Sequence, residues 1–96
     1  MMLHAQALVY SADSSALGER VVGDLAGTFR TQWAAEAGSI AVDDGVVELH
    51  AWPEALRLDA YAENDAALDR VETAVSGAIG AAAGISFVDW YRRPSS

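Results

Sequence analysis

The chain contains no cysteine and no lysine. Without cysteine it can form no disulfide framework, no thiolate zinc site and no cysteine nucleophile. This absence is compatible with a reducing cytoplasm, which is where we expect the protein to be located. Positive charge is also scarce, because six arginines stand against 14 Asp and Glu residues, and the formal net charge is −8. A chain this acidic repels phosphate backbones and anionic lipid, so we expect no nucleic-acid binding and no membrane binding.

Long apolar runs are missing as well. The small apolar stretch at residues 78–85 is far shorter than the roughly 20 residues of a membrane-spanning helix. The first residues lack the basic region that opens a signal peptide. The chain has 96 residues, of which 52% are hydrophobic and 21% are charged. These proportions predict one folded domain over residues 1–96.

Hydrophobic periodicity predicts a strand and then a helix at the start of the chain. The strand is indicated by apolar residues at every second position, namely Leu3, Ala5, Ala7 and Val9. Polar residues able to cap a helix follow at Ser11, Asp13, Ser14 and Ser15. Apolar spacings of three and four then predict an amphipathic helix over residues 14–29, carried by Leu17, Val21, Val22, Leu25 and Phe29.

Four short strands are predicted next. Their apolar positions are Trp33 and Ala35, then Ile40 and Val42, then Val47, Leu49 and Ala51, and finally Leu56, Leu58 and Ala60. The dipeptide Asp44-Gly45 favours a two-residue hairpin loop, because both central residues of such a loop need a positive φ. This loop would place Val42 opposite Val47. We interpret the acidic turn as a plain hairpin, since the other ligands of a calcium loop are absent.

A second helix is predicted over residues 65–82, followed by a last strand over residues 85–92. Asn64 and Asp65 offer a cap, and Gly84 ends the helix. Gly77 and Gly80 either let the helix approach a sheet closely or end it early. The tail of the chain, Arg92-Arg93-Pro94-Ser95-Ser96, is predicted to be frayed.

The predicted order is strand, helix, four strands, helix, strand. It indicates an α+β fold of two layers, in which a mainly antiparallel curved sheet carries both helices on one face. The arrangement resembles one repeat of the TATA-binding-protein fold, or a small helix-grip fold. A ferredoxin-like fold is the alternative, although it has fewer strands between its helices.

Several segments carry a family resemblance. They are Gly38-Ser39-Ile40, Asp44-Gly45, Leu49-His50-Ala51, Leu56-Arg57-Leu58-Asp59-Ala60, Ala67-Leu68-Asp69-Arg70-Val71-Glu72 and Val88-Asp89-Trp90. In these segments the chain resembles a bacterial family catalogued as domain of unknown function 2218. Members of that family occur beside, or fused to, siderophore-interacting ferric reductases, so the resemblance implies an accessory role in iron–siderophore use. It implies no catalytic residue, because the basic, His-containing first helix of the family is absent here.

The outward side of the last two inner strands is the first candidate site. It carries Glu48, His50, Trp52, Arg57, Asp59 and Tyr61. If Pro53-Glu54 is a two-residue loop, Glu48 faces Asp59, and two opposed carboxylates destabilise a sheet unless they are separated, protonated or share a cation. A loop two residues longer pairs His50 with Asp59 instead. The surface is either a ligand or partner site, with His50 as a base or metal ligand in an enzymatic interpretation, or a solvated sheet face.

No other residue carries a recognisable chemistry. His4 has no partner nearby in the sequence, and we interpret it as a surface histidine. We assign no catalytic residue, no metal site and no cofactor.

Aromatic residues give the second candidate surface. Tyr10, Trp52, Tyr61 and Trp90, with Leu8, Val46 and Val88, alternate out of phase with the predicted core. If the helices cover one sheet face, these side chains crowd the other, and a contiguous apolar patch rarely stays exposed. We therefore expect a homodimer or a protein partner on this face.

The sequence thus predicts a small acidic, non-enzymatic binding or accessory domain that associates through its sheet. The alternatives are a homodimeric interaction module without a ligand, and a small enzyme using His50 with Glu48 or Asp59.

Overall fold

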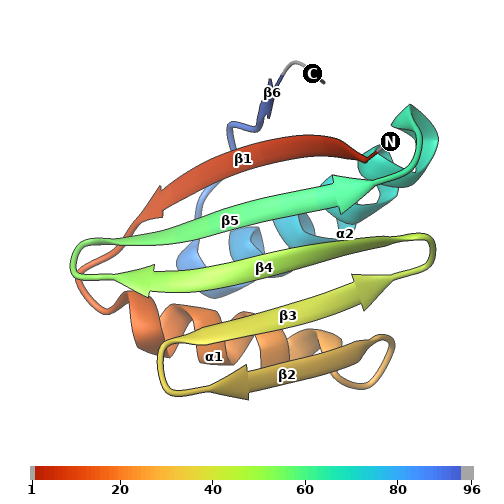
Figure 1. Ribbon diagram of the computed structural model, residues 1–96. Coiled ribbons are helices and arrows are strands. Elements are labelled where there is room, and N and C mark those ends of the chain that lie inside the picture. The colour runs from red at the N-terminus through yellow and green to blue at the C-terminus, as the bar shows by residue number, and fades with distance from the viewer. Residues whose placement is uncertain (1, 94–96) are drawn as a thin grey trace.

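The computed structural model describes residues 2–93 and shows a two-layer α+β fold (Figure 1). The elements in chain order are β1 (Leu3–Tyr10), α1 (Ser14–Leu25), β2 (Arg30–Ala34), β3 (Ala37–Val42), β4 (Gly45–Trp52), β5 (Ala55–Ala62), α2 (Asp65–Ala83) and β6 (Tyr91–Arg93). The sheet has the order β2-β3-β4-β5-β1-β6, and all neighbouring strands run antiparallel. Both helices lie behind one face of the sheet. The expected fold is therefore confirmed, and the ferredoxin-like alternative is wrong, because four strands separate the two helices.

The core lies between the helices and the inner face of the sheet. The helices bury Leu17, Val21 and Val22 from α1, and Leu68, Val71, Val75 and Ile79 from α2. The sheet meets them with Ile40, Val47, Leu49, Leu56 and Leu58. Because burial of apolar area is the main favourable contribution to folding, this single cluster stabilises both layers together. The other face of the sheet has no helix over it (Figure 1).

Helix α1 is shorter than the periodicity predicted. Its N-cap is Asp13, whose carboxylate accepts a hydrogen bond of 3.1 Å from the Ala16 backbone N–H. The helix ends at Leu25, whose carbonyl accepts hydrogen bonds from the N–H groups of Thr28 and Phe29. Phe29 still packs against the core. The spacing therefore identified Phe29 correctly as a core residue, but Phe29 lies in the turn after the helix and not in the helix itself.

Helix α2 begins and ends close to the predicted residues. The side chain of Asn64 caps it by accepting a hydrogen bond of 2.9 Å from the Ala67 N–H. Gly84 ends it with a left-handed φ of 70°, a conformation that costs glycine little. Neither proposed role of Gly77 and Gly80 holds: the helix continues through both, and the close neighbour of Gly80 is the backbone of the segment after the helix.

Substitution by alanine should have opposite effects on stability at two glycines of α1. Gly23 is exposed with no neighbour within 4 Å, so Gly23→Ala should stabilise the protein by about 1 kcal/mol through helix propensity. A Cβ on Gly18 would lie 2.8 Å from Trp33 Cζ3 and 3.1 Å from Leu56 Cδ1. We expect Gly18→Ala to lose about 1 kcal/mol, because overpacking outweighs the same gain in propensity. Urea denaturation measures both variants, and stabilisation by both would contradict the packing of Trp33 on α1.

The hairpin between β3 and β4 differs from the predicted register. The loop is Asp43-Asp44, with Asp43 at a φ of 51°, and Val42 pairs with Gly45. A shift of two residues leaves every side chain on the same face, so the hydrophobic pattern could not distinguish the two registers. Gly45 is needed for packing, because a Cβ there would lie 2.5 Å from Val71 Cγ2 of α2.

The predicted last strand is mostly absent. Only Tyr91–Arg93 pairs with β1, at His4, Ala5 and Gln6. Residues 85–90 run beside α2, where the Trp90 indole N–H donates a 2.8 Å hydrogen bond to Ser76 Oγ. This contact draws the segment away from the edge of β1.

The predicted frayed tail is partly ordered. The Arg92 side chain forms ion pairs with Asp65, Asp69 and Glu72 of α2. Residues 94–96 lie outside the described residues. Within residues 2–93, neither helix has the length and apolar character required to cross a membrane.

Candidate functional site

The open face of the sheet, meaning the face without helices, carries every residue predicted for the site. The strand registers place Glu48, His50 and Trp52 on β4, and Arg57, Asp59 and Tyr61 on β5, all directed to this face. Their alternation with the buried residues of the same strands follows from the period of two in a strand. The six residues therefore share one face, as predicted. The chemistry of that face depends on which of the side chains contact each other.

The loop between β4 and β5 decides the cross-strand pairs. Pro53-Glu54 forms the tight two-residue connection, so His50 faces Arg57 and Glu48 faces Asp59. The longer loop, which would have paired His50 with Asp59, is wrong. The two opposed carboxylates are tolerated because Asp59 accepts hydrogen bonds from Arg57 and His4, while Glu48 is exposed to solvent.

Asp59 is the centre of a polar network on the open face. It is 5% exposed, and its Oδ2 accepts a 2.9 Å hydrogen bond from Arg57 Nε. Its Oδ1 accepts a 2.8 Å hydrogen bond from His4 Nε2 on β1. Burial by itself raises the pKa of Asp59, but the hydrogen bonds and charges of Arg57 and His4 outweigh burial, so the pKa lies below its usual value. Asp59 is therefore ionised at neutral pH.

His4 lies on the sheet surface, with its side chain 26% exposed, and it also belongs to the network through a partner that is distant in the sequence. Its ring stacks on Tyr61, with centroids 4.5 Å apart and an angle of 9° between the planes. Burial, followed by the charges of Asp59 and Glu48, raises the pKa of Tyr61, so its hydroxyl stays protonated at neutral pH. Only the alternation of β1 could have placed His4 on the open face, and its partner on β5 lies 55 positions away in the sequence.

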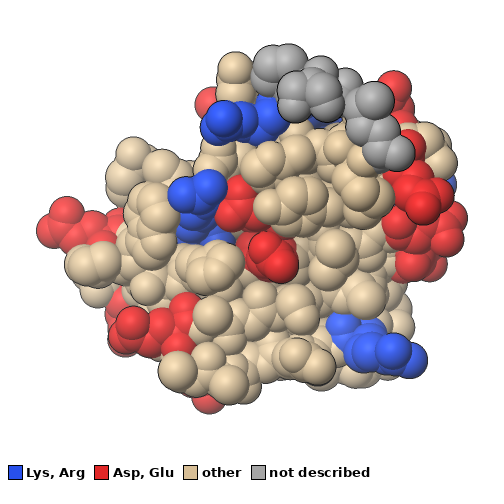
Figure 2. Space-filling view, in the orientation of Figure 1, with Lys and Arg blue, Asp and Glu red and all other residues tan. Residues whose placement is uncertain are grey.

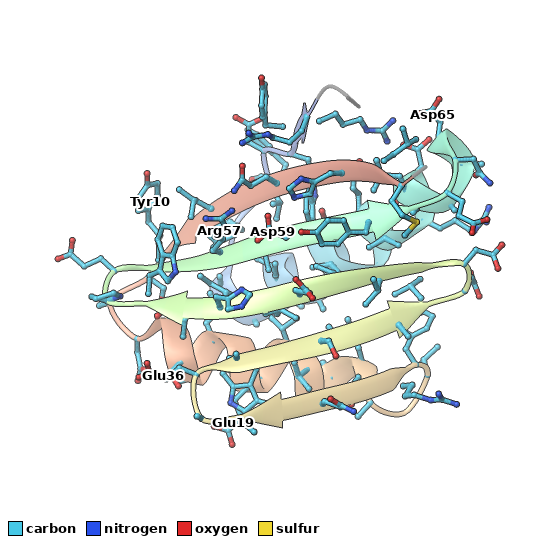
Figure 3. The ribbon with its side chains drawn as sticks, in the orientation of Figure 1. Tyr10, Glu19, Glu36, Arg57, Asp59 and Asp65 are labelled. Atoms are coloured by element: carbon cyan, nitrogen blue, oxygen red, sulfur yellow. The ribbon has the colours of Figure 1, made fainter. Side chains whose placement is uncertain are left out.

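Arg57 connects the polar network to the aromatic residues. Its guanidinium carbon lies 5.3 Å from the centre of the Trp52 ring, a distance that allows a cation–π interaction. Figure 3 shows Arg57 and Asp59 next to each other on β5, with Tyr10 at the end of β1. His50 is exposed, and no side-chain hydrogen bond joins it to any residue between positions 2 and 93.

The aromatic surface is confirmed only in part. Tyr10, Trp52 and Tyr61 lie on the open face, together with Leu8 and Val46. Trp90 and Val88 do not, because both pack against the core from the side of α2. Tyr91 takes a place on the open face instead, opposite Gln6.

The open face is nearly neutral in a strongly acidic protein. Its strands present Arg30, Arg57 and Arg93 against Glu48 and Asp59. The other 12 carboxylates share the remaining surface with only three arginines. Figure 2 shows most acidic side chains at the left and right edges of this face, and two acidic groups nearer its centre, beside blue arginine atoms. Contact through this face therefore avoids most of the repulsion that the net charge of −8 creates.

A hollow of about 450 Å³ opens at one end of the open face. Its walls include Leu8, Tyr10, Trp52, Arg57, Asp89 and Tyr91. The hollow is lined both by the end of β1 and by Asp89 of the segment before β6. Its volume falls in the range of about 300–1,000 Å³ that is typical of small-molecule sites.

The side chains do not gather into a metal centre. Within the part of the chain that the structure describes, no three His, Asp or Glu residues are arranged to hold a metal ion.

Comparison with known proteins supports the fold. No protein-family model matches the chain, and no curated protein does. Its structure is similar to that of PA4090 from Pseudomonas aeruginosa, which was determined by NMR, with a TM-score of 0.76 and 16% sequence identity over 96% of each chain. At this identity the similarity establishes a shared fold and nothing further. The resemblance to the domain of unknown function 2218 stays a prediction.

Proposed function

We propose that the protein is a non-enzymatic binding domain that associates with a second copy of itself through the open face of the sheet. The observation that carries the proposal is the near neutrality of this face, which the rest of the acidic surface lacks. Apolar side chains are also exposed there, including Leu8 and Trp52. A two-fold interface uses the same surface on both copies, so a self-complementary, nearly neutral face suits it.

The network around Asp59 supports this proposal. A buried charge is costly when it loses water without a partner. Asp59 already has its partners, Arg57 and His4, within the same chain. Covering the open face with another protein therefore removes less hydration than it would from an unpaired carboxylate.

An enzyme built on His50 with Glu48 or Asp59 has less support. A general base must lie within hydrogen-bond reach of its partners. His50 is exposed on an open strand, and Asp59 is held by His4 and Arg57 instead.

Self-association is tested by sedimentation over a range of protein concentrations. We expect the wild type to dimerise at tens of micromolar, and Val46→Glu to weaken the dimer at least about tenfold, because it places an unpaired charge on the open face. Ala81→Glu is the matched control, since Ala81 is exposed on α2 behind the sheet, and it should leave the dimer unchanged. A wild type that stays monomeric at several hundred micromolar, or equal effects of both variants, would contradict the proposal.

An accessory role in iron–siderophore use rests on the sequence resemblance. We propose that such a role works through a protein partner, because the acidic surface repels an anionic ferric siderophore. Transcription together with iron-uptake genes, increased under iron limitation, would support it, and constant expression apart from such genes would contradict it.

A further inference from the structure

The hollow on the open face exists because two backbone segments separate. The last residues of β1 lack a strand on the β6 side, since β6 pairs only with His4, Ala5 and Gln6. The preceding segment is held toward α2 by the Trp90–Ser76 hydrogen bond and by the ion pairs of Arg92. Asp89 and Tyr91 therefore line the hollow together with Leu8 and Tyr10. Contacts on both sides of the segment fix this separation.

Three aromatic side chains line the hollow and remain open to solvent. Tyr10 is 80% exposed, Tyr91 is 62% exposed and Trp52 is 44% exposed. The faces of aromatic rings attract cations, and several rings around one space form the kind of site that holds substituted ammonium groups. One cation already uses this attraction here, because Arg57 lies over Trp52.

The charges at the hollow also favour a cation. Arg57 is balanced by Asp59, which accepts two hydrogen bonds from its guanidinium group. Asp89 lines the hollow, and across residues 2–93 no ion pair or hydrogen bond engages its carboxylate. One negative charge is therefore unbalanced at the hollow. The net charge of −8 adds an attraction for cations at longer range.

We propose that this hollow binds an organic cation, specifically an alkyl-substituted ammonium group. Tyr10, Trp52 and Tyr91 provide the aromatic surfaces, and Asp89 provides the opposing charge. An anion would be repelled by the carboxylate of Asp89, and an uncharged ligand would have no charge–charge attraction to it. The site goes beyond the proposed self-association, and all its named residues belong to one chain, although Trp52 also lies on the surface proposed for the dimer.

The test is an NMR titration of the full chain with choline and with 3,3-dimethyl-1-butanol, which has the same shape without the charge. We expect choline to bind with a dissociation constant on the order of millimolar, and the uncharged analogue to bind at least about tenfold more weakly. The amide signals that shift should belong to Tyr10, Trp52, Asp89 and Tyr91. Equal binding of the two probes, binding of neither, or shifts elsewhere in the chain would overturn the proposal.

Two asparagine variants separate local recognition from net charge. Asp89→Asn should weaken choline binding about tenfold, because it removes the carboxylate at the hollow. Asp24→Asn makes the same change in net charge on the exposed surface of α1 and should leave the affinity within about twofold. Equal losses in both variants would show only general attraction and would overturn the site.

The self-association variant keeps the two proposals distinguishable. Val46 does not line the hollow, so Val46→Glu should weaken the dimer while choline still binds. Asp89→Asn should weaken choline binding while the dimer persists. The two surfaces share Leu8 and Trp52, so a dimer would partly cover the hollow. Choline is therefore titrated into the Val46→Glu variant as well as into the wild type, and failure to bind the monomeric variant counts against the hollow alone.

Discussion

Leu58→Ala should lower the free energy of unfolding by about 3 kcal/mol, the largest effect expected of any substitution considered for this protein. Leu58 lies on β5, is 0% exposed, and belongs to the cluster that joins both helices to the sheet. Removing its buried carbon atoms loses their transfer free energy and leaves a cavity that packed neighbours fill only partly. Chemical denaturation monitored by circular dichroism measures the loss.

Leu8→Ala is the matched control for this prediction. Leu8 lies on the neighbouring strand β1, opposite Arg57, and is 42% exposed on the open face. Because no helix covers it, the same substitution should cost less than about 1 kcal/mol. At protein concentrations too low for the proposed dimer, similar losses in the two variants would mean that both sheet faces are buried within one chain, and would contradict the two-layer architecture.

Asp59→Asn should lower the free energy of unfolding by about 2 kcal/mol at neutral pH. The amide gives Arg57 and His4 a neutral acceptor in place of a charged one, so the guanidinium loses its counter-charge on a partly buried surface. Solvent reaches part of Arg57, which keeps the effect below that of a fully buried ion pair. The substitution also removes the repulsion between Asp59 and Glu48, which offsets part of the destabilisation.

The contribution of Asp59 should also depend on pH. Its pKa is lower in the folded protein than in the unfolded chain, where it is about 3.9. The stabilisation is therefore fully present above about pH 4 to 5, and it is lost as the pH falls through the lowered pKa. The difference in stability between wild type and Asp59→Asn should shrink in this acidic range. A stability difference for Asp59→Asn that is independent of pH would contradict the network.

The fold was predictable because its strong signals are local. The alternation in β1 and β5 and the helical spacing in α2 place most core residues correctly, and Asn64 and Gly84 mark where α2 begins and ends. These signals arise from the geometry of a single element and need no knowledge of its neighbours.

The details that were missed depend on contacts between distant segments. The register at Asp43-Asp44 could not be distinguished from one shifted by two residues, and packing of Gly45 against Val71 accompanies the register observed. The segment at residues 85–90 has the composition of a strand, yet Trp90 finds a partner on α2.

The site was predicted as a surface but not as a network. All six residues lie on the open face, because alternation determines the face. Only the longer of the two loops considered would have paired Asp59 with His50, and its partner is His4, which the antiparallel pairing of β1 with β5 brings near. Charge and alternation therefore located the surface, and only the sheet order identified the histidine.

The position of β1 in the sheet has a consequence for how the protein folds. β1 lies far in the sequence from both strands that flank it, since Leu3 pairs with Ala62 and His4 pairs with Arg93. The pairing of β1 with β5 and β6 therefore requires distant parts of the domain to meet, and contacts of such long sequence separation slow folding relative to a helical protein of the same size. Until these strands meet, the apolar side of β1 has no neighbouring strand beside it.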